Sequence, residues 1–242
     1  MKNFIKSVIN LFKVNIRYSI TPGVSIFGYN LYGDIRSGVN KSRSSYALDY
    51  VKSLKSKHVL DVGSGGGQHA KEFIDNGSDV VCVDFGTSIY AKNDDNNYKN
   101  ISLVNVDFKN FTSDKKFDLV WASHILEHQR DVGSFIEKII SHCDDKGGAC
   151  CITVPDPHRG LWGGHLTLWT PGLLAYNIVL CGVDLSEAIF IRGTDEFSIF
   201  FILKRFSLPK DLTFDSGDIK KLTGYFPEGM KENSDPWAVK YI

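Results

Sequence analysis

The stretch from Val59 to His69, with the sequence VLDVGSGGGQH, constrains the fold of this chain more than any other. It begins with apolar and β-branched residues, which are typical of a strand buried in a parallel sheet. Glycines follow, and residues 70–74 then carry a helical pattern. Glycine lets the backbone turn sharply and approach a ligand, and the free N–H groups at the start of the helix face that ligand. The stretch therefore predicts a strand, loop and helix that cradle a nucleotide.

The acidic residue at the end of this strand separates two cofactor classes. Gly65, Gly67 and Ala70 fit a weak version of the dinucleotide fingerprint Gly-x-Gly-x-x-Gly or Ala. That interpretation leaves Asp61 unexplained, because a carboxylate would repel a pyrophosphate, whereas it suits a ligand with a cationic amino-acid end. The motif resembles the first motif of class I S-adenosylmethionine-dependent methyltransferases. The resemblance implies cofactor contacts from Asp61, Gly63, Ser64, Gly65 and Gly67.

Composition narrows the class of protein. The 242 residues and the hydrophobic content of 43% suit one α/β domain with modest additions. Lysine and arginine balance aspartate and glutamate at 28 each, so charge gives no reason to expect a nucleic-acid partner. The five cysteines have no repeating spacing, which favours a reducing compartment over a disulfide framework. We therefore predict a cytoplasmic protein without a membrane-spanning segment.

Strand and helix patterns alternate regularly from residue 57 onward. Strands are predicted at 58–62, 79–84, 101–106, 117–122 and 147–154, and helices at 67–76, 87–92 and 132–142. A helix at 170–180 and a closing hairpin with strands at 188–192 and 197–204 follow. Such alternation indicates parallel strands joined by crossover helices. Ligands bind at the carboxyl ends of the strands in sheets of this kind.

The second and third strands end in acidic residues. Asp84 and Phe85 come about 20 residues after the glycine loop, where a carboxylate can accept hydrogen bonds from both hydroxyls of a ribose. Asp107 and Phe108 follow the third strand, and Asp107 taken alone fits a helix cap. In the methyltransferases that this chain resembles, an acidic side chain here meets the adenine amine and its apolar neighbour lies on the ring. We therefore include all four residues in the predicted cofactor site.

The fourth strand runs into Ser123, His124, Glu127 and His128. This segment closely resembles the fourth motif of small-molecule methyltransferases, which often contains Leu-Glu-His, and we place Ser123 at the cofactor. Positions i, i+3 and i+4 share one face of a helix, so we expect His124, Glu127 and His128 to lie together on a helix. His165, after two glycines, is a candidate for a further imidazole at the acceptor side.

Three interpretations of these acidic and imidazole side chains stay open, with His124, Glu127, His128 and His165 as the candidate catalytic residues. In the first, one histidine takes the acceptor's proton and Glu127 fixes its tautomer. In the second, the Glu-His pair holds a divalent metal, as in some RNA and quinol methyltransferases of this superfamily; a metal is not part of the predicted cofactor set. In the third, the pair caps the helix and closes the pocket.

The sequence pattern of residues 1–20 predicts a basic amphipathic helix. Lys2, Lys6, Lys13 and Arg17 share a sector of about 60°, and apolar residues fill the adjoining half. Two interpretations stay open. The helix could lie on an anionic surface at the inner face of a membrane, as a peripheral contact, or pack its apolar face on the domain.

The insert at 160–171 combines glycine, tryptophan and histidine after the fifth strand. Aromatic faces pack well on sugars or rings, so we expect this insert to form a wall for the acceptor. With the neutral charge and the basic N-terminal helix, it favours O-methylation of a glycan, such as a surface polysaccharide sugar, or of another small molecule. The alternatives are a quinol or phenol O-methyltransferase with a Glu-His metal site, a non-catalytic S-adenosylmethionine-binding module and, disfavoured by Asp61, a nicotinamide dehydrogenase.

The resemblance to class I methyltransferases covers residues 57–204. It implies a Rossmann-like, seven-stranded, mostly parallel sheet with helices on both faces and an antiparallel C-terminal hairpin, and S-adenosyl-L-methionine as cofactor. We divide the chain into a helical and lid-like segment at 1–56, a methyltransferase domain at 57–205 and a tail at 206–242 that packs on the domain.

Overall fold

The computed structural model describes residues 25–26, 29–30, 44–87, 101–157, 163–230, 239 and 241–242. The chain divides into two compact units, residues 1–41 and 42–242. In the first unit, strands β1 (Ser25–Ile26) and β2 (Tyr29–Asn30) form an antiparallel pair. The helix predicted at 1–20 lies outside the described residues, as does all but the first residue of the helix predicted at 87–92.

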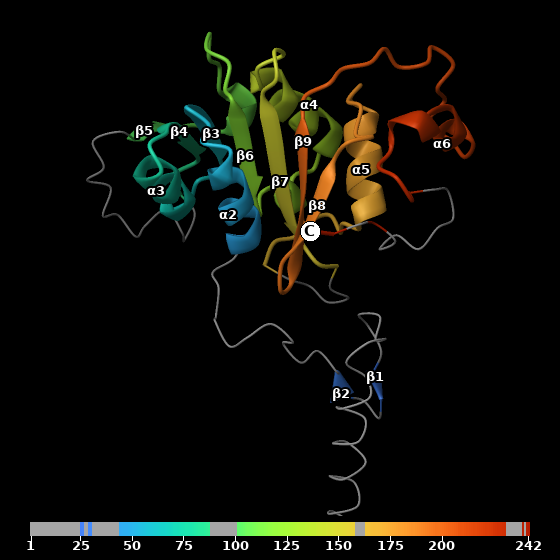
Figure 1. Cartoon of the computed structure of the whole chain (residues 1–242), viewed down its shortest axis with the longest axis horizontal. Helices are drawn as coiled ribbons and strands as arrows, with labels where there is room; N and C mark the ends of the chain where they lie inside the picture. The colour runs from blue at the N-terminus through green and yellow to red at the C-terminus, as the bar shows by residue number, and fades with distance from the viewer. Residues whose placement is uncertain are drawn as a thin grey trace, which may run out of the picture. The chain divides into compact units, whose positions relative to one another are not determined.

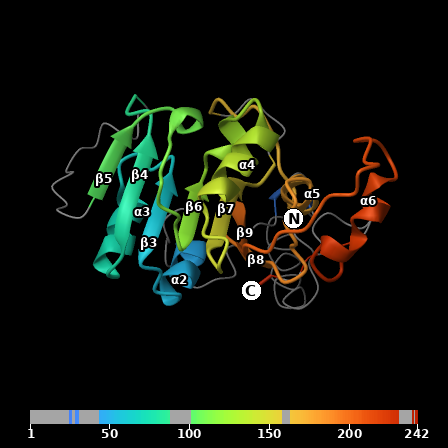
Figure 2. The ribbon, with the colours of Figure 1, turned by 90° about the horizontal axis from the view of Figure 1, so that it is seen from above.

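The second unit is built on a seven-stranded sheet in the order β5-β4-β3-β6-β7-β9-β8 (Figures 1 and 2). Its strands are β3 (His58–Val62), β4 (Asp79–Asp84), β5 (Ile101–Asn105), β6 (Leu119–Ser123), β7 (Ala149–Pro155), β8 (Ile189–Arg192) and β9 (Glu196–Ile202). Strands β3 to β7 pair in parallel, whereas β9 pairs antiparallel with both β7 and β8. The predicted Rossmann-like sheet with an antiparallel C-terminal hairpin is confirmed.

Helices cover both faces of the sheet because its strands are apolar on both faces (Figure 1). These helices are α2 (Ser45–Ser53), α3 (Gln68–Asp75), α4 (Val132–His142) and α5 (Pro171–Val179). Along β6, Leu119 and Trp121 belong to a buried cluster with residues of α2 and α3. The alternate residues Val120 and Ala122 belong to a second cluster with residues of α4 and α5. A parallel sheet buried on both sides needs this continuous apolar sequence.

Five strands, β5 to β9, differ from their predicted bounds by one or two residues at an end, and two of these differences are informative. The fourth strand was expected from residue 117, but Phe117 makes only an isolated parallel bridge to Cys143, and β6 begins at Leu119. The last strand begins at Glu196, one residue earlier than expected, because Glu196 pairs with Pro155 at the end of β7. This second difference bears on the site described below.

The tail contains helix α6 (Asp218–Lys221) and the short 3-10 helix η4 (Thr223–Tyr225). Tyr225 stacks on Phe206 with 3.6 Å between ring centroids, and Phe226 lies 6.2 Å from the ring of Tyr176 in α5. The described part of the tail thus packs against the helix layer on one face of the sheet.

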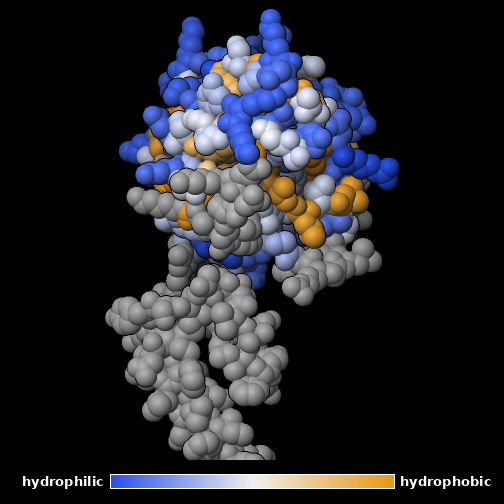
Figure 3. Space-filling model, turned by 90° about the vertical axis from the view of Figure 1, so that its right-hand side faces the viewer, coloured by the Kyte–Doolittle hydropathy of each residue, from blue (hydrophilic) through white to orange (hydrophobic). Residues whose placement is uncertain are grey.

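One face of the molecule is mainly hydrophilic, with a few separate hydrophobic side chains (Figure 3). Within the residues that the structure describes, no helix has both the length and the apolar character needed to cross a membrane.

Candidate active site

The glycine loop links the carboxyl end of β3 to α3. Gly63 has a φ of +74°, and a Cβ atom built on it would lie 2.7 Å from Cδ1 of Ile125. Gly67 also has a φ of +74° and is the N-cap of α3, whose first helical residue is Gln68. The helix therefore begins one residue later than the predicted start at Gly67. A side chain at position 63 would therefore strain the backbone and collide with Ile125. Only glycine at this position lets the loop approach Ile125 so closely.

Asp84 ties this loop to the end of β4. Its Oδ2 accepts a hydrogen bond from the Gly65 N–H at 3.0 Å, and its Oδ1 accepts one from the Gly86 N–H at 2.9 Å. The carboxylate predicted to bind a ribose thus also holds the loop. Each carboxylate oxygen retains a further lone pair that can accept a hydrogen bond.

Asp61 is buried beneath the loop, with 2% of its surface exposed. Its Oδ2 and the Oγ of Ser64 have no hydrogen-bond partner among the residues that the structure describes. Burial, and then the negative charge of Asp84, raises the pKa of Asp61 to about 7. A buried carboxyl group without a partner is costly, and a cationic ligand would relieve that cost. The loop therefore fits a ligand with a cationic amino-acid end.

A pocket opens beside Gly63 at the carboxyl ends of β4 and β5. It gathers five of the predicted cofactor residues and five that sequence reasoning missed. The predicted ones are Gly63, Asp84, Phe85, Asp107 and Phe108; the others are Val83, Val106, Ile125, Gln129 and Phe135. Of the remaining predicted residues, Asp61, Ser64, Gly65 and Gly67 belong to the strand and loop beside this pocket, whereas the Oγ of Ser123 lies 2.7 Å from that of Ser44.

Asp107 also has the local role that its position after β5 allows. Its Oδ1 accepts the Lys109 N–H at 3.0 Å and so caps the short 3-10 helix η2 (Phe108–Asn110). Its Oδ2 lies 2.8 Å from Nζ of the same lysine. The capping interpretation and the pocket position are therefore compatible.

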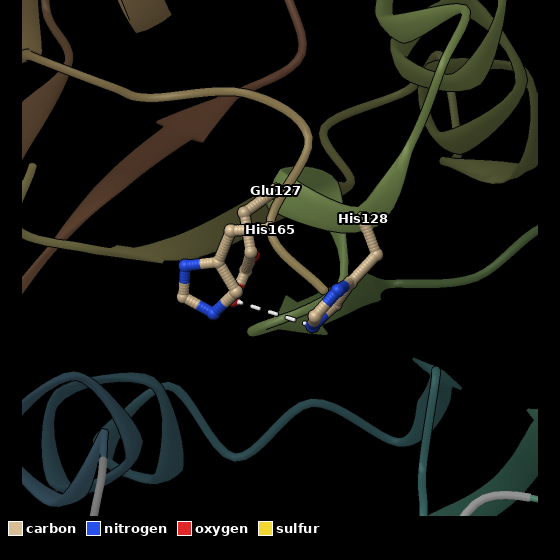
Figure 4. Close-up of side chains that lie close together, drawn as sticks. All are labelled: Glu127, His128 and His165. Atoms are coloured by element: carbon tan, nitrogen blue, oxygen red, sulfur yellow. Dashed lines mark ion pairs between the residues drawn. The ribbon is translucent and has the colours of Figure 1, made fainter. Parts of the chain in front are cut away.

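Acidic and imidazole side chains converge beyond β6. Figure 4 shows Glu127 and His128, both from the 3-10 helix η3 (Leu126–His128), close to His165 from the loop before α5. Oε1 of Glu127 lies 3.9 Å from Nε2 of His128 and 4.0 Å from Nε2 of His165. Neither carboxylate oxygen of Glu127, whose side chain is 1% exposed, has a hydrogen-bond partner in the described part of the chain. These ligand atoms lie within 4.8 Å of one another, close enough to hold one metal ion.

The tautomer of His128 follows from its backbone contact. Nδ1 lies 3.2 Å from the carbonyl oxygen of Gly164, and a carbonyl only accepts hydrogen bonds, so Nδ1 carries the hydrogen. In the neutral ring the lone pair is then on Nε2, the nitrogen that faces Glu127. The backbone of the loop that carries His165 is also fixed to Glu127, because the Leu166 N–H donates a hydrogen bond to the Glu127 carbonyl oxygen at 2.7 Å.

His124 does not share a helix with Glu127 and His128, and that prediction is wrong. It lies before η3 with a φ of +54°, so its ring is placed by contacts rather than by helical spacing. Nδ1 is 3.4 Å from Oε1 of Glu127, and Nε2 is 2.6 Å from Oε2 of Glu196. Burial alone would lower the pKa of His124, but the carboxylates of Glu127 and Glu196 outweigh burial and raise it to about 9. At neutral pH His124 is therefore a cation.

The predicted acceptor wall is only partly within the described residues. Trp162 lies outside them, and Trp169 is 3% exposed and belongs to the hydrophobic core. Trp169 thus presents no aromatic face to an acceptor, because its ring is buried in the core.

Comparison with known proteins agrees with this geometry. The family described as methyltransferase domain matches residues 36–187, more than half of the chain. The chain belongs to the methyltransferase-domain family. The class I fold, the order of motifs and the glycine loop all agree with that assignment, and the protein is an S-adenosylmethionine-dependent methyltransferase.

Two curated relatives are named ubiquinone biosynthesis O-methyltransferase. The protein from Rickettsia akari is 29% identical over 218 residues, which cover 84% of this chain and 79% of the relative. The protein from Coxiella burnetii is 28% identical over 207 residues, which cover 81% and 78%.

Among solved structures, the 1,6-didemethyltoxoflavin-N1-methyltransferase of Burkholderia thailandensis matches with a TM-score of 0.56 and 16% identity, covering 68% of this chain and 78% of that one. The N-methyltransferase NodS of Bradyrhizobium japonicum, solved with S-adenosyl-L-homocysteine, matches with a TM-score of 0.54 and 14% identity, covering 66% and 85%. At this level of identity the likeness shows the fold alone.

Proposed function

We propose that this methyltransferase transfers its methyl group to the hydroxyl oxygen of a small phenolic acceptor of the quinol type, with His128 as the general base. The observation that carries the proposal is the fixed tautomer of His128, whose basic Nε2 faces the buried carboxylate of Glu127. The names of the relatives from Rickettsia akari and Coxiella burnetii support an O-methylation of this kind.

The cofactor side of the reaction is assigned to the glycine loop and the pocket beside it. S-adenosylmethionine supplies an activated methyl group on a sulfonium, so the chain has to bind, orient and deprotonate rather than activate a donor. We assign Asp61 to the cationic amino-acid end, Asp84 to the ribose, and Asp107 with Phe108 to the adenine. Their burial, hydrogen bonds and positions in the pocket support these roles.

On the acceptor side, Nε2 of His128 takes the proton of the hydroxyl, and the charge of Glu127 stabilises the imidazolium that forms. His165 lies edge-on to His128 with 5.1 Å between ring centroids, and so forms a neighbouring wall. We assign His165 to holding the acceptor ring and hydroxyl in place.

An imidazole base is better matched to a phenol than to a sugar. A phenol has a pKa of about 10 and imidazole one of about 6.5, so proton transfer between them costs about 5 kcal/mol. An aliphatic hydroxyl, like water, is a far weaker acid than a phenol, so the same transfer from a sugar would cost much more free energy. The burial of Trp169 removes one of the features that favoured a glycan.

A metal-assisted version is the second candidate. The closeness of Glu127, His128 and His165, together with the unpartnered oxygens of Glu127, favours it. A divalent ion there would lower the pKa of the phenol directly, and His128 would then act as a ligand rather than as a base.

The test is transfer of a labelled methyl group from S-adenosylmethionine to 3,4-dihydroxybenzoate, with neutral hexoses and a nucleotide sugar as competing acceptors. We expect transfer to the catechol, reduced by a factor of roughly 10² to 10⁴ in His128→Asn. His58→Asn is the matched control, because His58 is an exposed histidine at the far end of β3.

Each alternative predicts a different result in the same assay. Transfer to the sugars and not to the catechol would contradict the phenol proposal. Full turnover by the His128→Asn variant would exclude His128 as the general base. Loss of wild-type activity after exhaustive chelation, with recovery on adding magnesium or zinc, would select the metal-assisted version.

A further inference from the structure

Glu196 is a buried carboxylate that no strand-end motif predicts. It is the first residue of β9 and pairs with Pro155, the last residue of β7. Because β9 runs antiparallel to β7, its beginning lies at the edge of the sheet where the parallel strands end. Glu196 is 7% exposed at that edge. It therefore lies beside the residues that follow β6.

Both carboxylate oxygens of Glu196 are occupied. Oε1 accepts a short hydrogen bond from the backbone N–H of Ser44, the residue before α2. Oε2 lies 2.6 Å from Nε2 of His124. The remaining nitrogen of His124 faces Glu127 at 3.4 Å. The ring of His124 thus bridges two buried carboxylates.

This bridge favours an imidazolium. A neutral imidazole carries one N–H and can serve only one carboxylate, whereas the imidazolium presents an N–H to each of them, as a hydrogen bond from Nε2 to Glu196 and as an ion-pair contact of 3.4 Å between Nδ1 and Glu127. Two carboxylates this close and this buried also need a positive charge between them.

The backbone is also shaped to hold this arrangement. His124 has a left-handed φ of +54°, which is unfavourable for a residue with a Cβ and persists only where surrounding contacts fix it. On the other side of the bridge, a Cβ on Gly193 would lie 2.4 Å from Cγ of Glu196. The turn between β8 and β9 therefore leaves room for the Glu196 side chain to fold toward His124.

From this geometry we propose that Glu196 is a positioning residue for methyl transfer, acting through the ring of His124 to hold the carboxylate of Glu127 toward His128 and His165. The inference rests on the proposed function, because it assigns Glu127 to the acceptor side. Without Glu196, His124 keeps one carboxylate partner, its ring can turn, and Glu127 loses its fixed orientation. A displacement of about 1 Å at a reacting group can cost roughly 100-fold in rate.

The experiment combines kinetics with NMR of ¹⁵N-labelled histidine side chains in the full chain. Glu196→Gln keeps the shape and removes the charge. Gly193→Ala keeps the charge and displaces the side chain. Asp184→Asn is the control, because it breaks the ion pair between Asp184 and Lys204, where the two charged groups are 3.0 Å apart, without touching His124.

In wild type we expect both ring nitrogens of His124 to carry protons at pH 7.5, with the Nε2 proton hydrogen-bonded to Glu196 and the signals assigned through His124→Asn. Glu196→Gln and Gly193→Ala should both lose the Nε2 signature and lower kcat 10- to 100-fold. Binding of S-adenosylhomocysteine should stay within twofold. Asp184→Asn should match wild type in all three measurements.

Retention of both His124 signals and of kcat within twofold in Glu196→Gln would overturn the proposal. A protein that is merely destabilised would show equal losses in cofactor binding, which also overturns it. If wild type methylates no phenol, the proposed function fails, but the NMR comparison still decides whether Glu196 holds His124. If Glu196→Gln does not fold, Gly193→Ala decides.

Discussion

Oδ2 of Asp84 accepts a hydrogen bond of 3.0 Å from the backbone N–H of Gly65, so the end of β4 is joined to the loop that follows β3. The other oxygen of Asp84 holds Gly86 in its own loop. One side chain therefore organises two adjacent loops at the edge where the proposed cofactor pocket lies. The proposed ribose contact and the structure of both loops depend on the same carboxylate.

Replacing Asp84 by alanine should weaken binding of S-adenosylhomocysteine roughly 10- to 100-fold. A hydrogen bond to a charged group contributes about 1.5–3 kcal/mol, and the variant also frees the glycine loop. Calorimetric titration measures the change. Asp79→Ala at the exposed opposite end of β4 is the control and should bind as wild type does. Unchanged affinity for S-adenosylhomocysteine in Asp84→Ala would show that Asp84 does not contribute to cofactor binding.

The buried carboxyl of Asp61 predicts a pH dependence of cofactor binding. Its pKa is raised to about 7 in the free protein, and a cationic ligand favours the ionised form. Binding below pH 7 must therefore displace a proton, so affinity should fall up to tenfold per pH unit below about 7 and level off above it. Titrations with S-adenosylhomocysteine between pH 5.5 and 7.5, in buffers of different ionisation enthalpy, measure both the affinity and the proton released.

Asp61→Asn supplies the control for that pH series. It removes the titrating group, so its affinity should be lower than that of wild type at pH 7.5 and nearly constant over the same range. A pH series in the variant that parallels wild type would assign the dependence to another group.

Gly63→Ala should destabilise the protein more than Gly77→Ala. Both glycines have positive φ, at +74° and +93°, so both variants suffer backbone strain. A Cβ atom at Gly63 also collides with Ile125, whereas a Cβ atom at Gly77 would have no neighbouring atom within 4 Å. Overpacking of this kind costs about 1–3 kcal/mol, which urea unfolding can resolve. The double variant Gly63→Ala with Ile125→Ala should recover part of the difference; equal losses in the two single variants would argue against the collision.

Glu127→Gln should separate chemistry from cofactor binding. The amide keeps the shape but removes the charge that stabilises an imidazolium at His128, so kcat should fall roughly 100-fold. The affinity for S-adenosylhomocysteine should stay close to wild type. An equal loss of both quantities would place Glu127 in the cofactor site instead.

Much of the fold could be predicted because strand patterns and glycine turns are local signals. The strand at 58–62 and the helix at 132–142 have the bounds that were expected. Parallel strands also place the residues that follow them at one edge, and for that reason Asp84 and Asp107 could be assigned to one pocket from sequence. Gln129 and Phe135, which also line this pocket, come from the chain after η3 and carry no motif.

The acceptor side was harder to predict because its geometry depends on contacts between distant segments. Glu196 meets His124 across 72 positions of sequence, and it is the first residue of its strand rather than a residue that follows one. The left-handed backbone of His124 cannot be inferred from a Leu-Glu-His motif, and so the expected shared helix face was wrong. A buried glutamate at the start of an antiparallel closing strand was the signal that could have been sought.

The two sides of the site draw on different lengths of the chain. Among the residues that the structure describes, those that line the proposed cofactor pocket all lie between 63 and 135, whereas the proposed acceptor side extends from the end of β6 through His165 to Glu196. The two sets overlap only around η3. During evolution, the later strands and loops can therefore accumulate substitutions that change the preferred acceptor while the earlier half, and the donor it binds, stay the same. A chimera that exchanges residues after 140 with those of a relative would transfer selectivity without disturbing nucleoside recognition.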